Sequence, residues 1–383
     1  MEEWKEYSLE ELSIGKGSYG IGAAAVPYDS SLYTYLRITD INDDGSLNKS
    51  GLMSVNDSDA GKYLLKPNDI VFARTGNSTG RSYFYDGSDG DLVYAGFLIK
   101  FSLNPEIVNP RILKYFTHSS IYYDWVRSFD TGGTRGNINA KTYGNMPIVL
   151  PPRSIQNKIV SILKSLDDKI ENNRKINENL EQQAQALFKS WFVDFEPFRD
   201  QPFVESELGM IPEGWRVGTL GELSNISSGK RPPLRSAQIT TTSNIPLLGA
   251  ADLMGYTNSY LFDKPILVTG RVGTHGIIQR WSTPCWPSDN TLVIESDYYE
   301  YIFQILKRID YKNLNRGSTQ PLITQSDLRN QTILIPKKLE ILKFEELIGT
   351  LMKKFKENND ESHRLSHLRD TLLPKLMSGE IKL

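Results

Sequence analysis

The sequence predicts an α+β protein in which two pseudo-repeated α/β domains are separated by two long helices that form an antiparallel coiled coil. Three observations lead to this fold class: the two halves of the chain are similar, each half mixes strand-like and helix-like segments, and each half ends in a long stretch with a heptad pattern. The 383 residues suffice for two or three domains of about 150 residues each.

The internal repeat consists of three matches that occur in the same order. They pair EEWKEYSLEEL (2–12) with EGWRVGTLGEL (213–223), DIVFARTGNSTG (69–80) with PILVTGRVGTHG (265–276), and GGTRGNINAKTYGNMPIVLP (132–151) with GSTQPLITQSDLRNQTILIP (317–336). The offset falls from 211 to 197 to 185 residues, so the first copy carries about 26 extra residues, which we expect in loops. The alternative is chance similarity between Gly/Thr-rich segments, and the shared order argues against it.

Each copy alternates short apolar runs with an amphipathic segment. IVFAR, LVYAGFLIKF and MPIVL in the first copy, and ILVTG, TLVIE and TILIPK in the second, are typical of strands. The segments 105–129 and 298–309 have a helical pattern.

A heptad pattern follows each copy. Residues 153–196 contain no Gly and no Pro, and their apolar seam consists of Ile159, Leu163, Leu166, Ile170, Asn173, Asn177, Leu180, Ala184, Leu187 and Trp191. The same offset of 185 gives Phe344, Ile348, Leu351, Phe355, Asn358, Ser362, Leu365, Arg369, Leu372 and Leu376, so that Asn173 and Asn358 coincide. We expect the two helices to pair, with Asn fixing the register at a cost in stability; the alternative is that each helix packs on its own domain.

These features divide the chain into five parts. We expect a first domain at 1–152, a central helix at 153–195, a linker with three prolines at 196–214, a second domain at 215–336 and a C-terminal helix at 337–383.

Composition gives a soluble, reduced, cytoplasmic protein as the expectation. Cys285 is the single cysteine, which excludes an intramolecular disulfide and a Cys₄ zinc site. The N-terminus lacks the apolar region of a signal peptide, and no apolar run approaches the roughly 20 residues of a membrane span. The 44 basic and 46 acidic residues give a net charge of −2, which by itself argues against a nucleic-acid-binding protein. A whole-chain average, however, hides a few basic residues in loops behind the mixed charges of long helices.

Motifs for catalysis or cofactor binding are weak. The sequence Gly15-Lys-Gly17-Ser-Tyr-Gly20 matches G-x-G-x-x-G, but it follows no clear strand and lacks a Walker lysine, so a close approach to another backbone is the preferred interpretation. His363 and His367 are expected on a solvated helix face, and Cys285 in a core or loop. We find no G-x-S-x-G, no Walker A and no N/D-P-P-Y motif, and we expect no catalytic residue and no bound metal.

Loops rich in Arg, Thr, Gly and Asn occur at matching places in both copies. Arg pairs bidentately with guanine, Asn and Gln pair with adenine, and Gly-rich loops with hydroxyl side chains suit phosphate oxygens. The candidate DNA-binding residues are Arg74, Thr75, Asn77, Arg81, Thr134, Arg135 and Asn137 in copy one, and Lys230, Arg231, Arg235, Arg271, Thr274, His275, Arg316, Thr319 and Gln320 in copy two.

With these repeats, helices and loops, the chain resembles the DNA-specificity subunit of type I restriction-modification systems. The most specific matches are LDDKIENNRKINENLEQQAQALFKSWFVDFEPF (166–198), LGMIPEGWRVGTLGEL (208–223) and DTLLPKLMSGEI (370–381). YLRITDI (35–41), DIVFARTGNSTG (69–80) and VYAGFLIKF (93–101) resemble the first recognition domain of the family. The resemblance covers essentially the whole chain.

The resemblance implies a non-catalytic DNA reader. Each target-recognition domain would read one half of a bipartite site in double-stranded DNA, and the helices would set the spacer and dock two methyltransferase (modification) subunits. Those subunits would carry S-adenosylmethionine, and restriction/translocase subunits would use ATP and Mg²⁺, so this chain would hold no cofactor. Half-sites on one face of DNA lie about 34 Å apart. A helix of 38 residues is about 57 Å long, so a pair of such helices can set this separation.

The two copies also differ where the resemblance places recognition loops. Arg135-Gly136-Asn137 in copy one becomes Gln320-Pro321-Leu322 in copy two, and Pro lacks an N–H donor, so we expect different half-sites. Two other functions remain open from the residues alone. A metal-dependent nuclease would need a carboxylate cluster, for which Asp40 and Asp69 are the candidates, and a coiled-coil interaction protein would have no DNA role.

Overall fold

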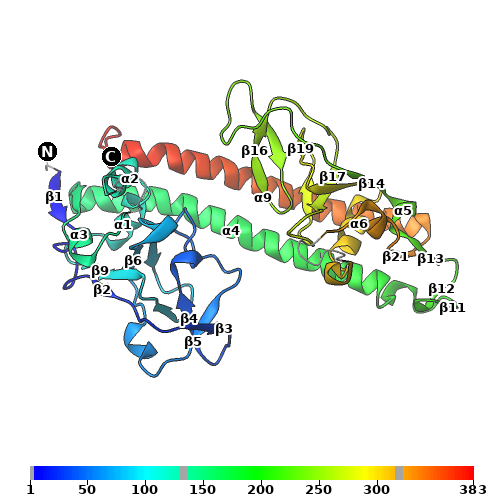
Figure 1. Cartoon of the computed structure of the whole chain (residues 1–383), viewed down its shortest axis with the longest axis horizontal. Coiled ribbons are helices and arrows are strands. Elements are labelled where there is room, and N and C mark those ends of the chain that lie inside the picture. Colours follow the sequence, from blue (N-terminus) through cyan, green and yellow to red (C-terminus); the bar gives the residue numbers. More distant parts are fainter. Residues whose placement is uncertain (1–3, 130–135, 315–321) are drawn as a thin grey trace. The chain divides into compact units, whose positions relative to one another are not determined.

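A computed structural model describes residues 4–129, 136–314 and 322–383 of the chain (Figure 1). The chain forms two compact units. Unit 1 comprises Met1–Asn172 and Glu361–Leu383, and unit 2 comprises Asn173–Asp360. Each unit contains small sheets, short helices and one segment from each of two long helices.

Unit 1 is built on two four-stranded sheets. The first has the order β2 (Ser18–Tyr19), β9 (Leu98–Ser102), β6 (Asp69–Ala73), β7 (Ser82–Tyr85), with every neighbouring pair antiparallel. The second has the order β3 (Ala25–Pro27), β5 (Met53–Val55), β4 (Tyr33–Leu36), β8 (Leu92–Tyr94), and β4 pairs with β8 in parallel. A separate antiparallel pair joins β1 (Lys5–Ser8) to β10 (Pro147–Leu150).

Strand β6 is the centre of unit 1 because it is covered on both faces. Ile70 and Phe72 belong to one apolar cluster, while Val71 and Ala73, which point to the opposite face, belong to another. All five residues of the strand are buried, which explains why its sequence is a continuous apolar run rather than an alternating one.

Short helices close the first of these clusters. They are α1 (Pro110–Phe116), α2 (Ser120–Arg127) and α3 (Ala140–Gly144). The helical segment expected at 105–129 is thus divided in two, because Thr117 ends α1 and the Ser119 side chain caps α2 by accepting the N–H of Tyr122. The cluster continues through Ile159 and Leu163 of the first long helix to Leu373 and Leu376 of the second.

Unit 2 repeats the first sheet of unit 1 strand for strand. Its order is β14 (Asn225–Ser228), β20 (Thr291–Glu295), β17 (Ile266–Gly270), β18 (Gln279–Trp281), again antiparallel throughout. The pair β13 (Arg216–Thr219) and β21 (Thr332–Ile335) corresponds to β1 and β10. The helices are α5 (Leu220–Leu223), α6 (Tyr299–Leu306), α7 (Tyr311–Leu314) and α8 (Gln325–Arg329). The predicted internal repeat is therefore confirmed in the topology of the two units.

The second sheets of the two units differ in their number of strands and in the loop between two of those strands. In unit 2 this sheet has the order β16 (Leu253–Thr257), β15 (Ile245–Leu248), β19 (Trp286–Pro287). Residues 249–252 join β15 to β16, whereas residues 37–52, which include the 3₁₀ turn η1 (Ile38–Asp40), join β4 to β5. The first of the two length differences between the copies therefore lies in a loop, as expected.

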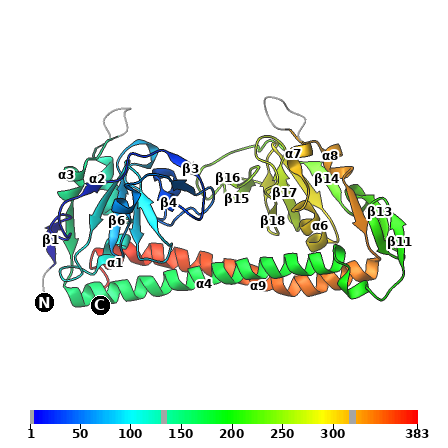
Figure 2. The same ribbon diagram turned by 90° about the horizontal axis from the view of Figure 1, so that it is seen from below.

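Two long helices of equal length complete the fold. They are α4 (Arg153–Phe192) and α9 (Lys338–Met377), and their first and last residues are separated by the same offset of 185. In each unit the two helices lie side by side and antiparallel (Figure 2). In unit 1, Asp167 contacts Arg369 at 3.0 Å and Lys169 contacts Glu361 at 3.2 Å.

The same direction holds in unit 2, where polar residues lie in the seam. The side-chain amide of Asn173 donates to the carbonyl oxygen of Asn358 at 3.4 Å, and that of Asn177 donates to the carbonyl oxygen of Phe355 at 3.1 Å. Asn358 in turn donates to Oδ1 of Asn177 at 2.9 Å. The antiparallel pairing is thus confirmed, although both helices also pack on their own domains.

The segment expected as a linker is folded into unit 2. A 3₁₀ turn, η4 (Glu196–Phe198), leads to a hairpin of β11 (Phe203–Ser206) and β12 (Gly209–Pro212). Phe198 and Ile211 are buried in one cluster with Trp215. Over the described residues, the structure contains no helix that is both long and apolar enough to cross a membrane.

Candidate nucleic-acid interface

The candidate loop of unit 1 leaves the end of β6. Two buried tyrosines hold its two ends: the hydroxyl of Tyr143 donates to the carbonyl of Ala73 at 2.9 Å, and that of Tyr122 donates to the carbonyl of Gly80 at 2.5 Å. The N–H of Gly80 also donates to the carbonyl of Ala73 at 3.0 Å, which closes the loop. Gly80 has a φ of +89°, a conformation that favours glycine.

Arg74 is the first residue of this loop, and its side chain is held in place. Its guanidinium carbon lies 5.1 Å from the centre of the Tyr19 ring, which is a cation–π contact. The backbone N–H of Arg74 donates to the carbonyl of Phe97 at 3.1 Å. Thr75 is partly buried and Asn77 is exposed on the 3₁₀ turn that follows. The loop therefore presents one fixed Arg and one exposed amide side chain.

A second segment of unit 1 lies against this loop. The N–H of Ile138 donates to the carbonyl of Arg74 at 3.0 Å, and the Thr79 hydroxyl donates to the carbonyl of Gly136 at 3.1 Å. These bonds place the exposed Asn137 beside the loop, a proximity that the sequence pattern did not indicate. Thr134 and Arg135 lie outside the described residues.

Arg81 has a different environment from Arg74. Its guanidinium contacts the Asp43 carboxylate at 2.5 Å and donates to the carbonyl of Ile41 at 3.1 Å. These contacts join the end of the loop to the 41–43 segment. Arg81 thus positions the loop, and its charge is directed at a carboxylate of its own unit.

The candidate loop of unit 2 leaves the end of β17 in the same way. The N–H of Ile323 donates to the carbonyl of Arg271 at 3.0 Å, and the N–H of Arg271 donates to the carbonyl of Asn290 at 2.8 Å. Thr274 is exposed, while the half-buried His275 places Nδ1 3.1 Å from the carbonyl of Gly270. Because a carbonyl oxygen can only accept, Nδ1 of His275 is the donor in this contact.

The remaining basic candidates of unit 2 lie on a neighbouring segment. Lys230 and Arg231 are exposed after β14, where the backbone N–H of Lys230 donates to the carbonyl of Pro287 at 3.0 Å. Arg235 is exposed as well and donates to the carbonyl of Met254 at 3.3 Å, so it lies against β16. Arg316, Thr319 and Gln320 lie outside the described residues.

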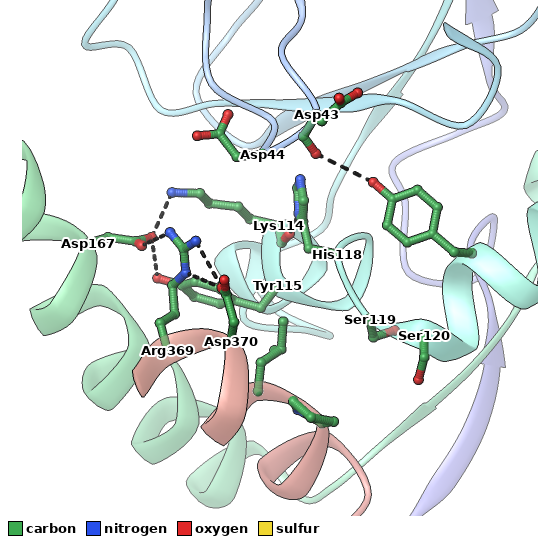
Figure 3. Close-up of a pocket in the computed structure, with 13 residues that line it drawn as sticks. Asp43, Asp44, Lys114, Tyr115, His118, Ser119, Ser120, Asp167, Arg369 and Asp370 are labelled. Carbon is green, nitrogen blue, oxygen red and sulfur yellow. Dashed lines mark hydrogen bonds and ion pairs between the residues drawn. The ribbon is translucent and has the colours of Figure 1, made fainter. Parts of the chain in front are cut away.

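A cavity of about 510 Å³ in unit 1 contains a network of ion pairs (Figure 3). Asp167 of α4 accepts from Lys114 at 2.8 Å, from the Tyr115 hydroxyl at 3.1 Å and from Arg369 of α9 at 3.0 Å. Burial raises the pKa of this carboxyl, but the charges and hydrogen bonds of Lys114 and Arg369 outweigh burial and hold the pKa below its usual value. The network fastens α1 to the long helices, and Asp43, which also lines the cavity, contacts Arg81 at the end of the candidate loop.

His118 lines the same cavity in a neutral form. Its Nδ1 lies 2.6 Å from the carbonyl of Lys114, and burial lowers its pKa. The role of these charges is therefore structural, since Lys114 and Arg369 both contact Asp167.

The residues considered for a nuclease take part in local contacts. Asp40 forms a two-pronged ion pair with Arg37 through contacts of 2.9 and 2.7 Å. Asp69 accepts the Ser102 hydroxyl at 2.6 Å and lies 3.3 Å from the Lys100 ammonium. In the part of the chain that the structure describes, no three or more His, Cys, Asp and Glu side chains are grouped so that they could hold a metal ion.

The two histidines of α9, Cys285 and the Gly-rich segment have the structural environments that the sequence indicated. His363 and His367 are exposed on α9. Cys285 is fully buried, and burial raises the pKa of its thiol to about 12, which makes it a poor nucleophile. A Cβ on Gly20 would lie 2.3 Å from the carbonyl oxygens of Tyr94 and Ala95, so the Gly-rich segment does approach another backbone, as predicted.

Comparison with known proteins identifies the family. The family model described as "Type I restriction modification DNA specificity domain" matches residues 1–182 and 212–367. The chain belongs to this family. It is 30% identical over 299 residues to the type I restriction enzyme MjaIX specificity subunit of Methanocaldococcus jannaschii, covering 70% of this chain and 68% of that one. It is 25% identical to the HindI specificity subunit of Haemophilus influenzae, with both chains covered completely.

The fold agrees with that of a solved family member. The crystal structure of the type I restriction-modification S subunit from M. genitalium has a TM-score of 0.55 and 18% sequence identity, covering 98% of this chain and 96% of that one. The resemblance stated from the sequence and the predicted fold class of the specificity subunit are both confirmed. The comparisons give no support to a nuclease.

Three residues of this specificity subunit that border the Arg loops were not identified from the sequence. Tyr19 contacts Arg74 through its ring, and the carbonyls of Phe97 and Asn290 accept the N–H groups of Arg74 and Arg271. Aligning AGFLIKF with DNTLVIE by their apolar residues places Phe97 opposite Thr291, so the sequence did not signal the pair. The equivalence of Phe97 and Asn290 follows from the strand pairing, in which Leu98 lies opposite Ala73 and Thr291 lies opposite Gly270.

Proposed function

We propose that this chain is the non-catalytic DNA reader of a type I restriction-modification complex, in which each unit reads one half of a bipartite site in double-stranded DNA. The observation that carries the proposal is a shared backbone frame around Arg74 and Arg271. In both units an Arg directly follows the central strand, donates its N–H to one loop and accepts an N–H from another.

This frame suits base recognition because it fixes the backbone from which the Arg side chain extends at the edge of a sheet. Bidentate pairing of Arg with guanine O6 and N7 needs a side chain whose origin is held within a fraction of an ångström. The carbonyls and N–H groups at 2.8 to 3.1 Å around Arg74 and Arg271 provide that origin. The exposed Asn77 and Asn137, and the exposed Thr274, extend the surface on either side.

The two readers would recognise different sequences. Arg74 lies over the Tyr19 ring, and the exposed Asn137 lies beside its loop. At the corresponding place, residues 321–322 of unit 2 are Pro and Leu. Since a bipartite site with unlike halves needs two unlike readers on similar scaffolds, this difference supports an asymmetric target.

The long helices would set the spacer and dock the two modification subunits. The register of the seam is fixed by hydrogen bonds between Asn173, Asn177 and Asn358, which specify one alignment of the helices. In unit 2, α9 also has Leu339, Leu342 and Leu347, whose exposed fractions are 63%, 44% and 43%. Apolar side chains on a helix surface suit a protein partner.

The chemistry of the complex would belong to the partner subunits. Methylation of adenine would use S-adenosylmethionine bound to the modification subunits, and translocation and cleavage would use ATP and Mg²⁺ bound to restriction subunits. The buried Cys285 thiol and the ion-paired Asp40 and Asp69 are consistent with a chain that contributes binding rather than catalysis.

Methylome sequencing of strains with and without this gene tests the proposal. Loss of one bipartite adenine-methylation motif on deletion, with its return on complementation, is the expected result. An unchanged methylome in a strain that actively methylates its DNA would overturn it. A neighbouring reading frame that encodes a methyltransferase with an N-P-P-Y motif is the corresponding expectation for gene context.

A further inference from the structure

Position 97 in unit 1 and position 290 in unit 2 are structurally equivalent. The carbonyl of Phe97 accepts the N–H of Arg74 at 3.1 Å, and the carbonyl of Asn290 accepts the N–H of Arg271 at 2.8 Å. Each residue directly precedes the strand that pairs with the central strand, since β9 begins at Leu98 and β20 at Thr291. The equivalence therefore rests on backbone hydrogen bonds and strand order, and not on side-chain similarity.

A second pair of equivalent positions flanks the same Arg residues. A Cβ on Gly20 would lie 2.3 Å from the carbonyl oxygen of Ala95, and one on Gly229 would lie 2.2 Å from that of Ser288. These two glycines thus occupy the same place, and the residues before them, Tyr19 and Ser228, correspond.

The side chains of this second pair make corresponding contacts. The Tyr19 hydroxyl accepts the N–H of Ala140 at 3.1 Å, and Ser228 Oγ accepts from the side-chain amide of Gln325 at 2.9 Å. Ala140 and Gln325 are the first residues of α3 and α8. The frame is thus the same in both units, while its side chains are not.

The two sets of side chains have different chemistry. Unit 1 combines Arg74 with the aromatic Tyr19 and Phe97, whose exposed fractions are 42% and 57%. Unit 2 combines Arg271 with the polar Ser228 and the exposed Asn290. The first set presents an apolar surface next to a guanidinium, and the second set presents an amide next to one.

We propose that positions 97 and 290 determine specificity, with Phe97 contacting the 5-methyl group of thymine and Asn290 pairing with N6 and N7 of adenine. This proposal rests on the proposed function and names the residue that reads a base beside each Arg. Apolar side chains contact the thymine methyl in the major groove, and Asn is the side chain that pairs bidentately with adenine. Because the backbone of each residue is bonded to the Arg, each base read would adjoin the base read by that Arg.

Tyr19 would act as a positioning residue for Arg74. Its ring lies under the guanidinium, whose Nε is buried and has no hydrogen-bond partner among the described residues, so the ring limits the directions in which the remaining N–H groups point. Ser228 has no ring to offer Arg271. The Arg74 half of the site should therefore tolerate fewer base changes than the Arg271 half.

The test is a pair of substitutions, Phe97→Asn and Asn290→Phe, made in the full chain together with its modification subunits. Methylome sequencing, or methylation of a library with randomised half-sites, gives the motif for each variant. We expect Phe97→Asn to change the preferred base at one position of one half-site by roughly tenfold and to leave the other half intact. Asn290→Phe should change the other half in the same way.

Two further variants separate specificity from folding. Ile121→Asn in α2 is the matched control, because Ile121 is also an apolar residue of unit 1 and is 55% exposed; it should leave both half-sites unchanged. Phe97→Leu keeps an apolar side chain and should keep the wild-type base preference. If Phe97→Asn does not fold, Phe97→Leu and Asn290→Phe still test the proposal.

Failure of this inference differs from failure of the proposed function. A wild-type complex without a bipartite motif would contradict the proposed function. A wild-type complex with such a motif, whose two halves are both unaltered in Phe97→Asn and Asn290→Phe, would overturn the assignment of these two positions alone. Equal relaxation of both halves by a single variant would also overturn it.

Discussion

The N–H of Ile323 donates to the carbonyl oxygen of Arg271 at 3.0 Å, and Ile138 makes the same bond to Arg74 at 3.0 Å. In each unit this bond joins the end of the central strand to the segment before a short helix, α8 or α3. Because the bond is between backbone groups, the side chain of the Arg can be changed without removing the frame.

Replacement of Arg271 by Ala should therefore weaken one half-site only. We expect a loss of roughly tenfold in affinity, with relaxed preference at one base of that half and an unchanged preference in the other half. Binding to a panel of single-base variants of the target measures this. Arg199→Ala, which removes an exposed Arg directly after η4 in the same unit, is the control. Equal relaxation of both halves would contradict modular reading.

Binding of DNA by the isolated chain should be weak. The net charge is −2, so the chain by itself neutralises few phosphates, and under the proposed function the modification subunits would supply much of the cationic surface. Fluorescence anisotropy with a labelled duplex over a range of salt concentrations tests this, with and without added modification subunits. Tight binding by the chain alone that persists at high salt would be incompatible with this view.

Replacement of Asn358 by Ala should destabilise the helix pair of unit 2. The buried Asn358 amide donates to Oδ1 of Asn177 at 2.9 Å, and its loss leaves that buried oxygen without this donor. The free energy of unfolding should fall by about 1–3 kcal/mol, measured by denaturant titration. Lys353→Ala, on the exposed face of α9, should change it by less than about 0.5 kcal/mol. An Asn358→Ala variant as stable as the wild type would refute the role of this bond.

The stability of unit 2 should fall as the pH rises toward neutrality because of Glu300. Burial raises the pKa of Glu300 to about 7; the charge of Arg280, 2.7 Å away, opposes the rise, and Glu345 adds to it. A carboxyl group with a raised folded-state pKa is protonated in the fold while it ionises in the unfolded chain. The loss in the free energy of unfolding that Glu300 causes therefore grows from about pH 4 to pH 7 and reaches its full size above pH 7.

Glu300→Gln removes this titration and keeps an oxygen that accepts from Arg280. The variant should be more stable than the wild type by on the order of 3 kcal/mol at pH 8, and the difference should shrink as the pH falls to 5 and below. Denaturant titrations of both proteins at several pH values measure it. A difference that does not depend on pH would show that Glu300 does not titrate in this range.

Much of the fold was predictable because local patterns and the repeat agree. The heptad positions, such as Ile159 and Phe344, are buried or half-buried in the helix pair. The apolar run IVFAR marked a strand, β6, and the structure adds that both of its faces are covered. The hairpin at 203–212 was not predicted, because three prolines suggested an extended linker, whereas Phe198 and Ile211 bury themselves beside Trp215.

The candidate site was predicted in part. Arg74, Asn77 and Asn137 were named as candidates in two separate loops, and hydrogen bonds between these loops bring them together in the structure. Arg81 was expected in the same role, but its guanidinium is bound to Asp43, a residue 38 positions earlier that no local pattern connects with it. Phe97 was missed because an aromatic residue within a strand-like run is indistinguishable from a core residue until its exposure is known. Tyr19 was missed because it lies in a Gly-rich segment that no local pattern connects with Arg74.

The sequence by itself determined the family, the duplication, the two long helices and the loops that contain Arg, because each of these is a pattern in the order of residues. The tertiary structure decided which of those side chains remain exposed, and that Phe97 and Asn290 occupy one position in two frames. The physical reason is that burial, ion pairing and backbone hydrogen bonds join residues distant in the chain, such as Arg74 with Ile138, and these contacts exist only after folding.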